Sequence, residues 1–283
     1  MLSSKKPIRR PLGRPAPPHT DASVVRGGKE GSGMPPAVER NAGRGTIVGT
    51  LSFPVSKSGA LRDNSHIIAE IIRRRSPGLL LCAGFSVPCT KTLRPIKDAT
   101  RQTGTVAVLE TNSPRVSFQI RDGRSISMGE QFYATRDDTN KHPSGLTCLA
   151  NALSKRSFRF SGRPVLLLVC GEITVIQGRT NVDFHCSAPP KLQDAVRAER
   201  VLILNPTHTR MGNSGTIRAW RRFLSAKGRV YVSASNWNVR KTKGRRQKPS
   251  PTLHSFWHDR NCSKPCFQIR CIFFDYREWV LRR

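Results

Sequence analysis

The stretch Gly162-Arg163-Pro164-Val165-Leu166-Leu167-Leu168-Val169-Cys170-Gly171-Glu172 decides the fold class. Its residues 165–169 form a short, wholly apolar run, which predicts a strand buried on both faces. Strands of this kind belong to layered α/β proteins. Cys170 directly follows the run, and open α/β sheets gather their functional groups at the carboxyl ends of strands. We therefore expect a buried strand that presents a cysteine at a functional edge of a sheet.

Further strands alternate with helices on both sides of this stretch. Asp63 or Asn64 can cap a helix in which Ile68 and Ile72 share one face, and Asp122-Gly123 predicts a hairpin turn. The predicted strands include residues 46–53, 79–83, 105–109, 201–204 and 230–232, and the predicted helices cover residues 64–75, 93–99, 192–196 and 217–224. This succession of helices and buried strands predicts an α/β layered fold.

The charge of the chain is far from balanced. Its 283 residues include 49 Lys and Arg against 18 Asp and Glu, for a net charge of +31. Charge alone therefore predicts non-specific, salt-sensitive binding to nucleic acid. Residues 1–45 are rich in Pro and Gly and hold nine basic residues, so we expect a disordered basic arm. A nucleic-acid-binding tail, a transit peptide and a dispensable extension are the open interpretations of this arm.

Other composition signals exclude several protein classes. No apolar run reaches the roughly 20 residues of a membrane span, so we expect no membrane insertion, and no secretory signal is apparent. The spacing of the eight cysteines is not typical of a disulfide framework, which favours a reducing, cytoplasmic compartment. His254, His258, Cys262, Cys266 and Cys271 lie close together, but their spacing does not match a usual zinc site. We expect no metal and no other cofactor.

The order of these segments resembles the nitrilase, or carbon–nitrogen hydrolase, superfamily. The matching segments are the strand at 46–53, the helix at 64–75, the strand at 79–84, the Asp-Gly hairpin within 115–131, the motif at 162–172, the strand at 201–206 and the helix and strand within 221–236. The resemblance covers residues 46–260 and implies a four-layer α-β-β-α sandwich. It leaves residues 261–283 as a basic, cysteine-containing C-terminal segment, and it implies a homodimer.

The resemblance also implies a catalytic triad of Glu as general base, Lys as oxyanion stabiliser and Cys as nucleophile. Cys170 matches the nucleophile, but the Glu position falls at Gly84 and the Lys position at Gln131, which can donate a hydrogen bond but carries no charge. Glu110, at the end of the strand at 105–109, or Glu172 could supply a carboxylate to the same sheet edge. The alternative interpretation is that both acids are structural and that Cys170 is a small core residue.

Two classes of function follow from these observations. The first is a divergent carbon–nitrogen hydrolase that cleaves a small amide or nitrile through a thioester at Cys170. The absence of the family Glu and Lys should cost several orders of magnitude in rate, so a pseudoenzyme is the other outcome within this class. The second class is a non-catalytic basic protein that binds nucleic acid through electrostatic contacts, although the charge is spread too evenly to outline a groove.

Overall fold

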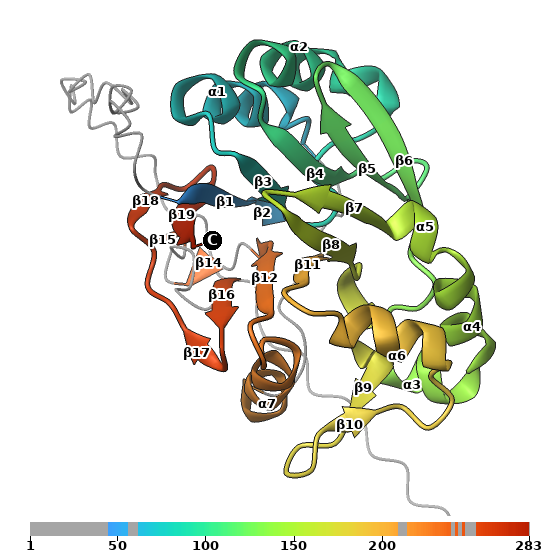
Figure 1. Ribbon diagram of the computed structural model, residues 1–283. Coiled ribbons are helices and arrows are strands. Elements are labelled where there is room, and N and C mark those ends of the chain that lie inside the picture. Colours follow the sequence, from blue (N-terminus) through green and yellow to red (C-terminus); the bar gives the residue numbers. More distant parts are fainter. Residues whose placement is uncertain are drawn as a thin grey trace, which may run out of the picture. The chain divides into compact units, whose positions relative to one another are not determined.

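The computed structural model describes residues 45–55, 62–208, 214–238, 241–242, 245–246 and 253–282 (Figure 1). The predicted basic arm at 1–45 lies outside the described residues, apart from Gly45. Among the described residues, no helix is both long enough and apolar enough to cross a membrane.

Seven strands form the first sheet, in the order β18-β19-β1-β3-β4-β5-β6 (Figure 1). In chain order they are β1 (Thr46–Ser52), β3 (Leu79–Cys82), β4 (Val106–Glu110), β5 (Val116–Arg121), β6 (Arg124–Glu130), β18 (Phe267–Arg270) and β19 (Asp275–Leu281). Strands β1, β3 and β4 are parallel, and the outer strands are antiparallel. The predicted hairpin is confirmed, because Asp122 and Gly123 both have the positive φ angles, 50° and 76°, of a type I′ turn between β5 and β6.

Six strands form the second sheet, in the order β17-β16-β12-β11-β8-β7. In chain order they are β7 (Ser157–Phe160), β8 (Arg163–Leu167), β11 (Leu202–Thr207), β12 (Val230–Ser235), β16 (His254–His258) and β17 (Asn261–Cys262). The central strands β8, β11 and β12 are parallel, so their carboxyl ends lie along one edge. Strand β11 continues through Pro206 to Thr207, which is farther than the sequence pattern predicts.

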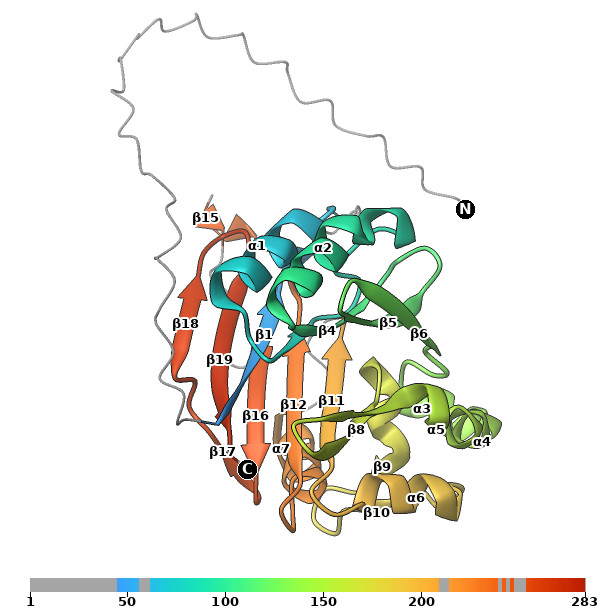
Figure 2. The ribbon, with the colours of Figure 1, turned by 45° about the horizontal axis from the view of Figure 1, so that its top comes forward.

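Helices cover the outer faces of the two sheets (Figures 1 and 2). Helices α1 (Ser65–Arg75) and α2 (Arg94–Thr103) lie on the first sheet, and α4 (Ser144–Asn151), α6 (Pro190–Arg197) and α7 (Ser214–Leu224) pack on the second. Between the sheets, a buried apolar core joins residues such as Val48 and Leu81 to Leu167 and Leu204. These layers are those of the predicted four-layer α-β-β-α sandwich.

Short elements complete the described chain. They are β2 (Pro54–Val55), η1 (Thr90–Leu93), α3 (Arg136–Lys141), α5 (Leu153–Arg156), η2 (Cys170–Val175), β9 (Ile176–Gln177), β10 (Asp183–Phe184), β13 (Trp237–Asn238), β14 (Lys241–Thr242) and β15 (Arg245–Arg246).

The C-terminal segment 261–283 contributes strands to both sheets. Strand β19 pairs with β1 over seven residues, and Glu278 on β19 forms a buried ion pair with Arg75 of α1, with 2.9 Å between Arg75 Nε and Glu278 Oε1. The boundary drawn at residue 260 therefore does not separate two structural units. The charged residues of β19 hide its strand pattern in the sequence, because Asp275 and Arg277 are buried as an ion pair.

Candidate active site

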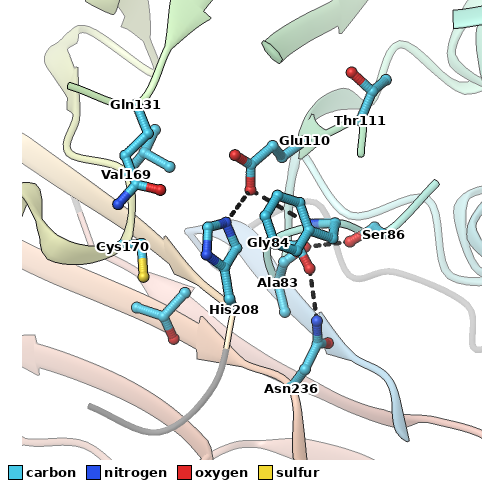
Figure 3. A network of polar contacts seen from close by, with 12 residues as sticks. Ala83, Gly84, Ser86, Glu110, Thr111, Gln131, Val169, Cys170, His208 and Asn236 are labelled. Carbon is cyan, nitrogen blue, oxygen red and sulfur yellow. Dashed lines mark hydrogen bonds and ion pairs between the residues drawn. The ribbon is translucent and has the colours of Figure 1, made fainter. Parts of the chain in front are cut away.

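Three strand ends bring three functional side chains together between the sheets (Figure 3). Strand β8 leads into Cys170, its parallel neighbour β11 leads into His208, and β4 of the opposite sheet ends on Glu110. His208 Nε2 lies 2.7 Å from Glu110 Oε2, and the side chains of His208 and Cys170 also form a hydrogen bond. In Figure 3 the imidazole of His208 lies between the thiol of Cys170 and the carboxylate of Glu110.

The electrostatics of this group favour the imidazolium form of His208. The side chain of His208 is 19% exposed and that of Glu110 only 1%. Burial by itself lowers the pKa of His208, but the interactions with Cys170 and Glu110 outweigh it and raise this pKa to about 9. An imidazolium next to a thiol, oriented by a carboxylate, is an arrangement that activates cysteine nucleophiles.

Gly84 makes room for this imidazole. A Cβ atom at position 84 would lie 2.2 Å from His208 Cδ2 and 2.8 Å from Glu110 Oε2. The ring of His208 therefore occupies the space into which any side chain at position 84 would project. The family resemblance places the general base at this position, and here a side chain from another strand fills the same space.

The turn after β3 supports the imidazole. Phe85, which has a positive φ of 54°, stacks on His208 with ring centroids 3.6 Å apart and an interplanar angle of 8°. Its backbone N–H donates to Glu110 Oε2 at 3.3 Å. The carbonyl oxygen of Gly84 accepts a 2.6 Å hydrogen bond from Asn236 Nδ2. These contacts fix the face of the imidazole and the carboxylate that orients it.

Cys170 has a strained backbone that a buried polar network holds in place. Its φ is +45°, a conformation that is uncommon for residues other than glycine, and the residue is 7% exposed. Asn205 Nδ2 donates to the carbonyl oxygens of Cys170, at 3.1 Å, and Leu168, at 2.5 Å. Asn205 Oδ1 accepts from the hydroxyl of Tyr231 at 2.7 Å. Backbone strain of this kind persists where the surroundings over-determine it, often at functional sites.

Glu172 anchors the same turn. Its Oε2 accepts the N–H of Val169 at 2.7 Å, and its Oε1 accepts the N–H of Phe132 at 3.0 Å and lies 3.1 Å from Arg156 Nη2. Burial raises the pKa of Glu172 to about 7, although Arg156 and the two backbone donors oppose the shift. Both carboxylate oxygens of Glu172 are therefore occupied by these donors, and Glu110, not Glu172, lies beside the imidazole.

Comparison with solved structures finds the same fold in a bacterial enzyme. A glutamate-to-leucine mutant of the amidase from Nesterenkonia sp. AN1, with the acetamide moiety of fluoroacetamide covalently added at its active-site cysteine, matches with a TM-score of 0.52 and 12% identity over 85% of this chain and 92% of that one. A cysteine-to-alanine mutant of the same amidase in complex with butyramide gives 0.52 and 11%, over 84% and 92%. A cysteine-to-serine mutant, described as an amidase from the nitrilase superfamily, gives 0.51 and 11%, over 85% and 93%. The chain has the nitrilase fold.

Sequence comparisons add nothing to this likeness. No family model matches the chain, and no curated protein sequence matches it. At 11% to 12% identity, the structural likeness is evidence for the nitrilase fold alone.

Gln131 and Gly171 both contact the backbone of the loop that precedes α3. Gln131 Nε2 donates to the carbonyl oxygen of Tyr133 at 2.7 Å, so its amide is engaged by its own loop. The Cα of Gly171 faces the backbone of Ala134, whose carbonyl oxygen would lie 2.0 Å from a Cβ at position 171. Gly171 is therefore required for close backbone packing beside Cys170.

His208 is the residue that sequence reasoning missed. The signal was the strand at 201–206, because His208 follows its end as Cys170 follows the end of the neighbouring strand. Carboxyl ends of adjacent parallel strands share an edge, so a histidine there was a candidate base. Glu110 was expected at the same sheet edge as Cys170, but it ends a strand of the opposite sheet, and no local pattern indicates that it meets His208.

Among the described residues near the C-terminus, the cysteines and histidines do not come together as a group of three. Within the described ranges, no three His, Cys, Asp or Glu side chains are placed to hold a metal ion. His254 is buried, and its Nδ1 lies 2.6 Å from Thr50 Oγ1 on the opposite sheet. Cys262 and Cys266 are exposed and lie at the sheet margin.

Proposed function

We propose that this protein is a cysteine-dependent hydrolase that cleaves the C–N bond of a small amide. The arrangement Cys170–His208–Glu110 is the observation that carries the proposal. It supplies a nucleophile, a proton-transferring base and a carboxylate that orients the base, although none of the three side chains is the Glu or Lys of the family triad. In this proposal His208, from the end of β11, supplies the base that the family places at the position of Gly84.

The roles of the three side chains follow from their contacts. Because His208 is held as an imidazolium, the proton of the Cys170 thiol already resides on its ring, and Cys170 Sγ attacks the carbonyl carbon to form a tetrahedral intermediate. When this intermediate collapses, the C–N bond breaks and the imidazolium donates its proton to the departing nitrogen. Water then attacks the thioester with the neutral His208 as base, which releases a carboxylic acid and restores Cys170 beside the imidazolium. General acid–base catalysis of this kind contributes roughly 10²- to 10⁴-fold to a rate.

The unused oxygen of Glu110 favours a primary amide. Glu110 Oε1 is buried and accepts no hydrogen bond within the described part of the chain. A buried carboxylate oxygen without a donor is unfavourable, and the N–H of a bound amide would satisfy it. The small exposed fraction of Cys170, 7%, favours a compact substrate. The Nesterenkonia amidase with butyramide bound and with fluoroacetamide added to its cysteine supports the choice of small aliphatic amides as probes.

Fluoroacetamide labelling followed by mass mapping tests the proposal. We expect Cys170 to react faster than exposed Cys148, despite being far less accessible, because a neighbouring base activates it. The His208→Ala variant should slow the labelling of Cys170 by roughly 10²-fold or more, whereas His142→Ala, which removes an exposed histidine, should not. Butyramide hydrolysis should show the same order of activities.

A different result would favour the second class of function. Burial raises the pKa of the Cys82 thiol strongly, so Cys82 serves as an inert internal reference. If Cys170 reacts no faster than Cys82, and if His208→Ala changes nothing, Cys170 is a core residue and the hydrolase proposal fails. A non-catalytic protein that uses the nitrilase fold to bind an anionic partner would then be the better proposal.

A further inference from the structure

A cavity of about 820 Å³ on the helical side of the second sheet is lined by an unusual concentration of positive charge. Six of its twelve lining residues are basic and none is acidic, whereas Lys and Arg make up 49 of the 283 residues of the chain. The six come from the loop between β9 and β10, the end of α6, the end of α7, the turn before β12 and the turn after β16. They are Arg179, Arg197, Arg222, Lys227, Arg229 and Arg260.

Arg229 makes this group a built structure and not only a solvated charge cluster. It is 6% exposed, and its guanidinium is held at the end of α7, where Nε donates to the carbonyl oxygen of Leu224 at 3.1 Å and Nη2 to that of Phe223 at 2.8 Å. Burial lowers the pKa of Arg229, and the positive charges of Arg197 and Arg260 lower it further. Several cations therefore face one another across the same space.

Two exposed carboxylates lie near these cations. Asp259 Oδ1 accepts the N–H of Gly228, between Lys227 and Arg229, at 2.6 Å. Arg197 lies 3.8 Å from Asp183, in a pair whose side chains are both more than half exposed and which contributes little to stability. The guanidinium of Arg197 also lies over the ring of Phe184, with 4.5 Å to the ring centroid, which holds it at the cavity. An anion with a high density of negative charge, bound in the cavity, would offset the repulsion among these cations.

We propose that this cavity binds a ligand with closely spaced phosphate groups. Guanidinium groups match phosphate oxygens in paired, charge-assisted hydrogen bonds, and a polyphosphate concentrates its charge as the six cations do. A second copy of this chain does not fit the site, because it would bring further positive charge toward it. Cys170 belongs to the apolar core between the two sheets and does not line this cavity, which lies beside α6 and α7, so this site is separate from the proposed catalytic group.

Calorimetric titration of the full chain with inorganic tripolyphosphate tests the site. The cavity variant carries Arg222→Gln and Arg260→Gln, which replace exposed side chains and leave Arg229 intact. The matched control carries Lys91→Gln and Arg94→Gln, which remove the same charge at exposed positions of η1 and α2, on the helix layer of the other sheet. We expect saturable binding that the cavity variant weakens by roughly tenfold or more and the control by less than about twofold. Cys170→Ala should bind as the wild type does.

The opposite outcomes would overturn the proposal. Equal weakening in the two double variants would assign binding to diffuse charge, and an absence of saturable binding would leave the cavity without a phosphate ligand. Competition by a thirty-nucleotide oligo(dT) identifies the source of the phosphates. Displacement of tripolyphosphate by the oligonucleotide points to a nucleic-acid backbone, and binding of tripolyphosphate without such displacement points to a small phosphorylated molecule.

Discussion

The proposed chemistry depends on a single imidazole held by contacts from four directions. His208 meets Cys170 and Glu110 at its edges, stacks on Phe85 and fills the space above Gly84. A side chain from the end of β11 therefore fills the space beside Gly84, whereas Gln131 donates to the carbonyl oxygen of Tyr133. The two departures from the family pattern, at Gly84 and Gln131, are consequently not equivalent.

Glu110→Gln should lower the pKa of His208 from its wild-type value of about 9, since the carboxylate is one of the two groups that raise it. NMR titration of the His208 ring measures this pKa directly. An unchanged His208 titration would contradict the assigned contact.

The raised pKa of His208 also makes the stability of the fold depend on pH. The imidazolium stabilises the fold fully below pH 6.5, and this contribution, up to roughly 3 kcal/mol, is lost as the pH rises to about 9. Unfolding in urea at several pH values should show that the free energy of unfolding falls less over this range in Glu110→Gln than in the wild type.

Gly84→Ala tests the placement of the imidazole by steric displacement. The added methyl group would lie 2.2 Å from His208 Cδ2, so the ring must leave the position in which it contacts both Cys170 and Glu110. We expect fluoroacetamide to label Cys170 roughly 10²-fold more slowly. The control is Gly104→Ala, where φ is +70° and no atom lies within 4 Å, so the change should cost about 1 kcal/mol in stability without changing the labelling. Wild-type labelling in Gly84→Ala would show that His208 is dispensable.

At the scale of elements, the turn that follows β8 is tied to the next two strands of the second sheet, β11 and β12. Asn205 of β11 bridges the turn at Cys170 to Tyr231 of β12, and all three residues are buried. The network explains how a non-glycine residue keeps a positive φ at the nucleophile position. It also connects the geometry of the cysteine to the register of the sheet.

Asn205→Ala should lower the free energy of unfolding by about 3 kcal/mol, because it leaves two buried carbonyl groups and the Tyr231 hydroxyl without this partner. Tyr231→Phe removes one hydrogen bond and should cost about 1 kcal/mol. Urea unfolding measures both values, and exposed Asn151→Ala, expected within about 0.5 kcal/mol of the wild type, is the control. A cost of Asn205→Ala no larger than that of Asn151→Ala would mean that the network does not hold the turn.

At the scale of the whole molecule, the two ends of the described chain form adjacent strands. β1 pairs with β19 on one side and with β3 on the other. β19 therefore lies inside the first sheet, between β1 and the edge strand β18. Trp279 of β19 is 2% exposed and stacks on Phe256 of the second sheet, with ring centroids 5.9 Å apart. The last strand is thus part of the core between the sheets.

Deleting residues 275–283 should abolish the cooperative thermal transition, because it removes Trp279 from the core and leaves the buried Arg75 without Glu278. Deleting residues 1–44 should leave the thermal midpoint nearly unchanged, since the composition of that stretch gives it little apolar surface to bury. Circular dichroism during heating compares the two. A cooperative transition near the wild-type midpoint after the C-terminal deletion would refute the role assigned to β19.

Local pattern by itself determined the architecture of this protein. The apolar runs before Cys170 and at 79–83, the hairpin at Asp122-Gly123 and the alternation of helices with strands predicted the layered fold, because burial on both faces of a strand leaves a continuous apolar signature. The sequence also singled out Cys170 and placed Glu110 at a strand end. These inferences needed only neighbouring residues.

Which side chains meet depends on contacts between the two sheets. Glu110 and His208 are 98 residues apart and belong to different sheets, and nothing local couples them. Glu172 and Glu110 are equivalent candidates in the sequence, and they differ because backbone donors and Arg156 surround only Glu172. The strand character of β19 was hidden for the same reason, since its charged residues are buried by ion pairs with distant partners. Contacts between segments remote in the chain depend on the packing of the two sheets, which no local pattern records.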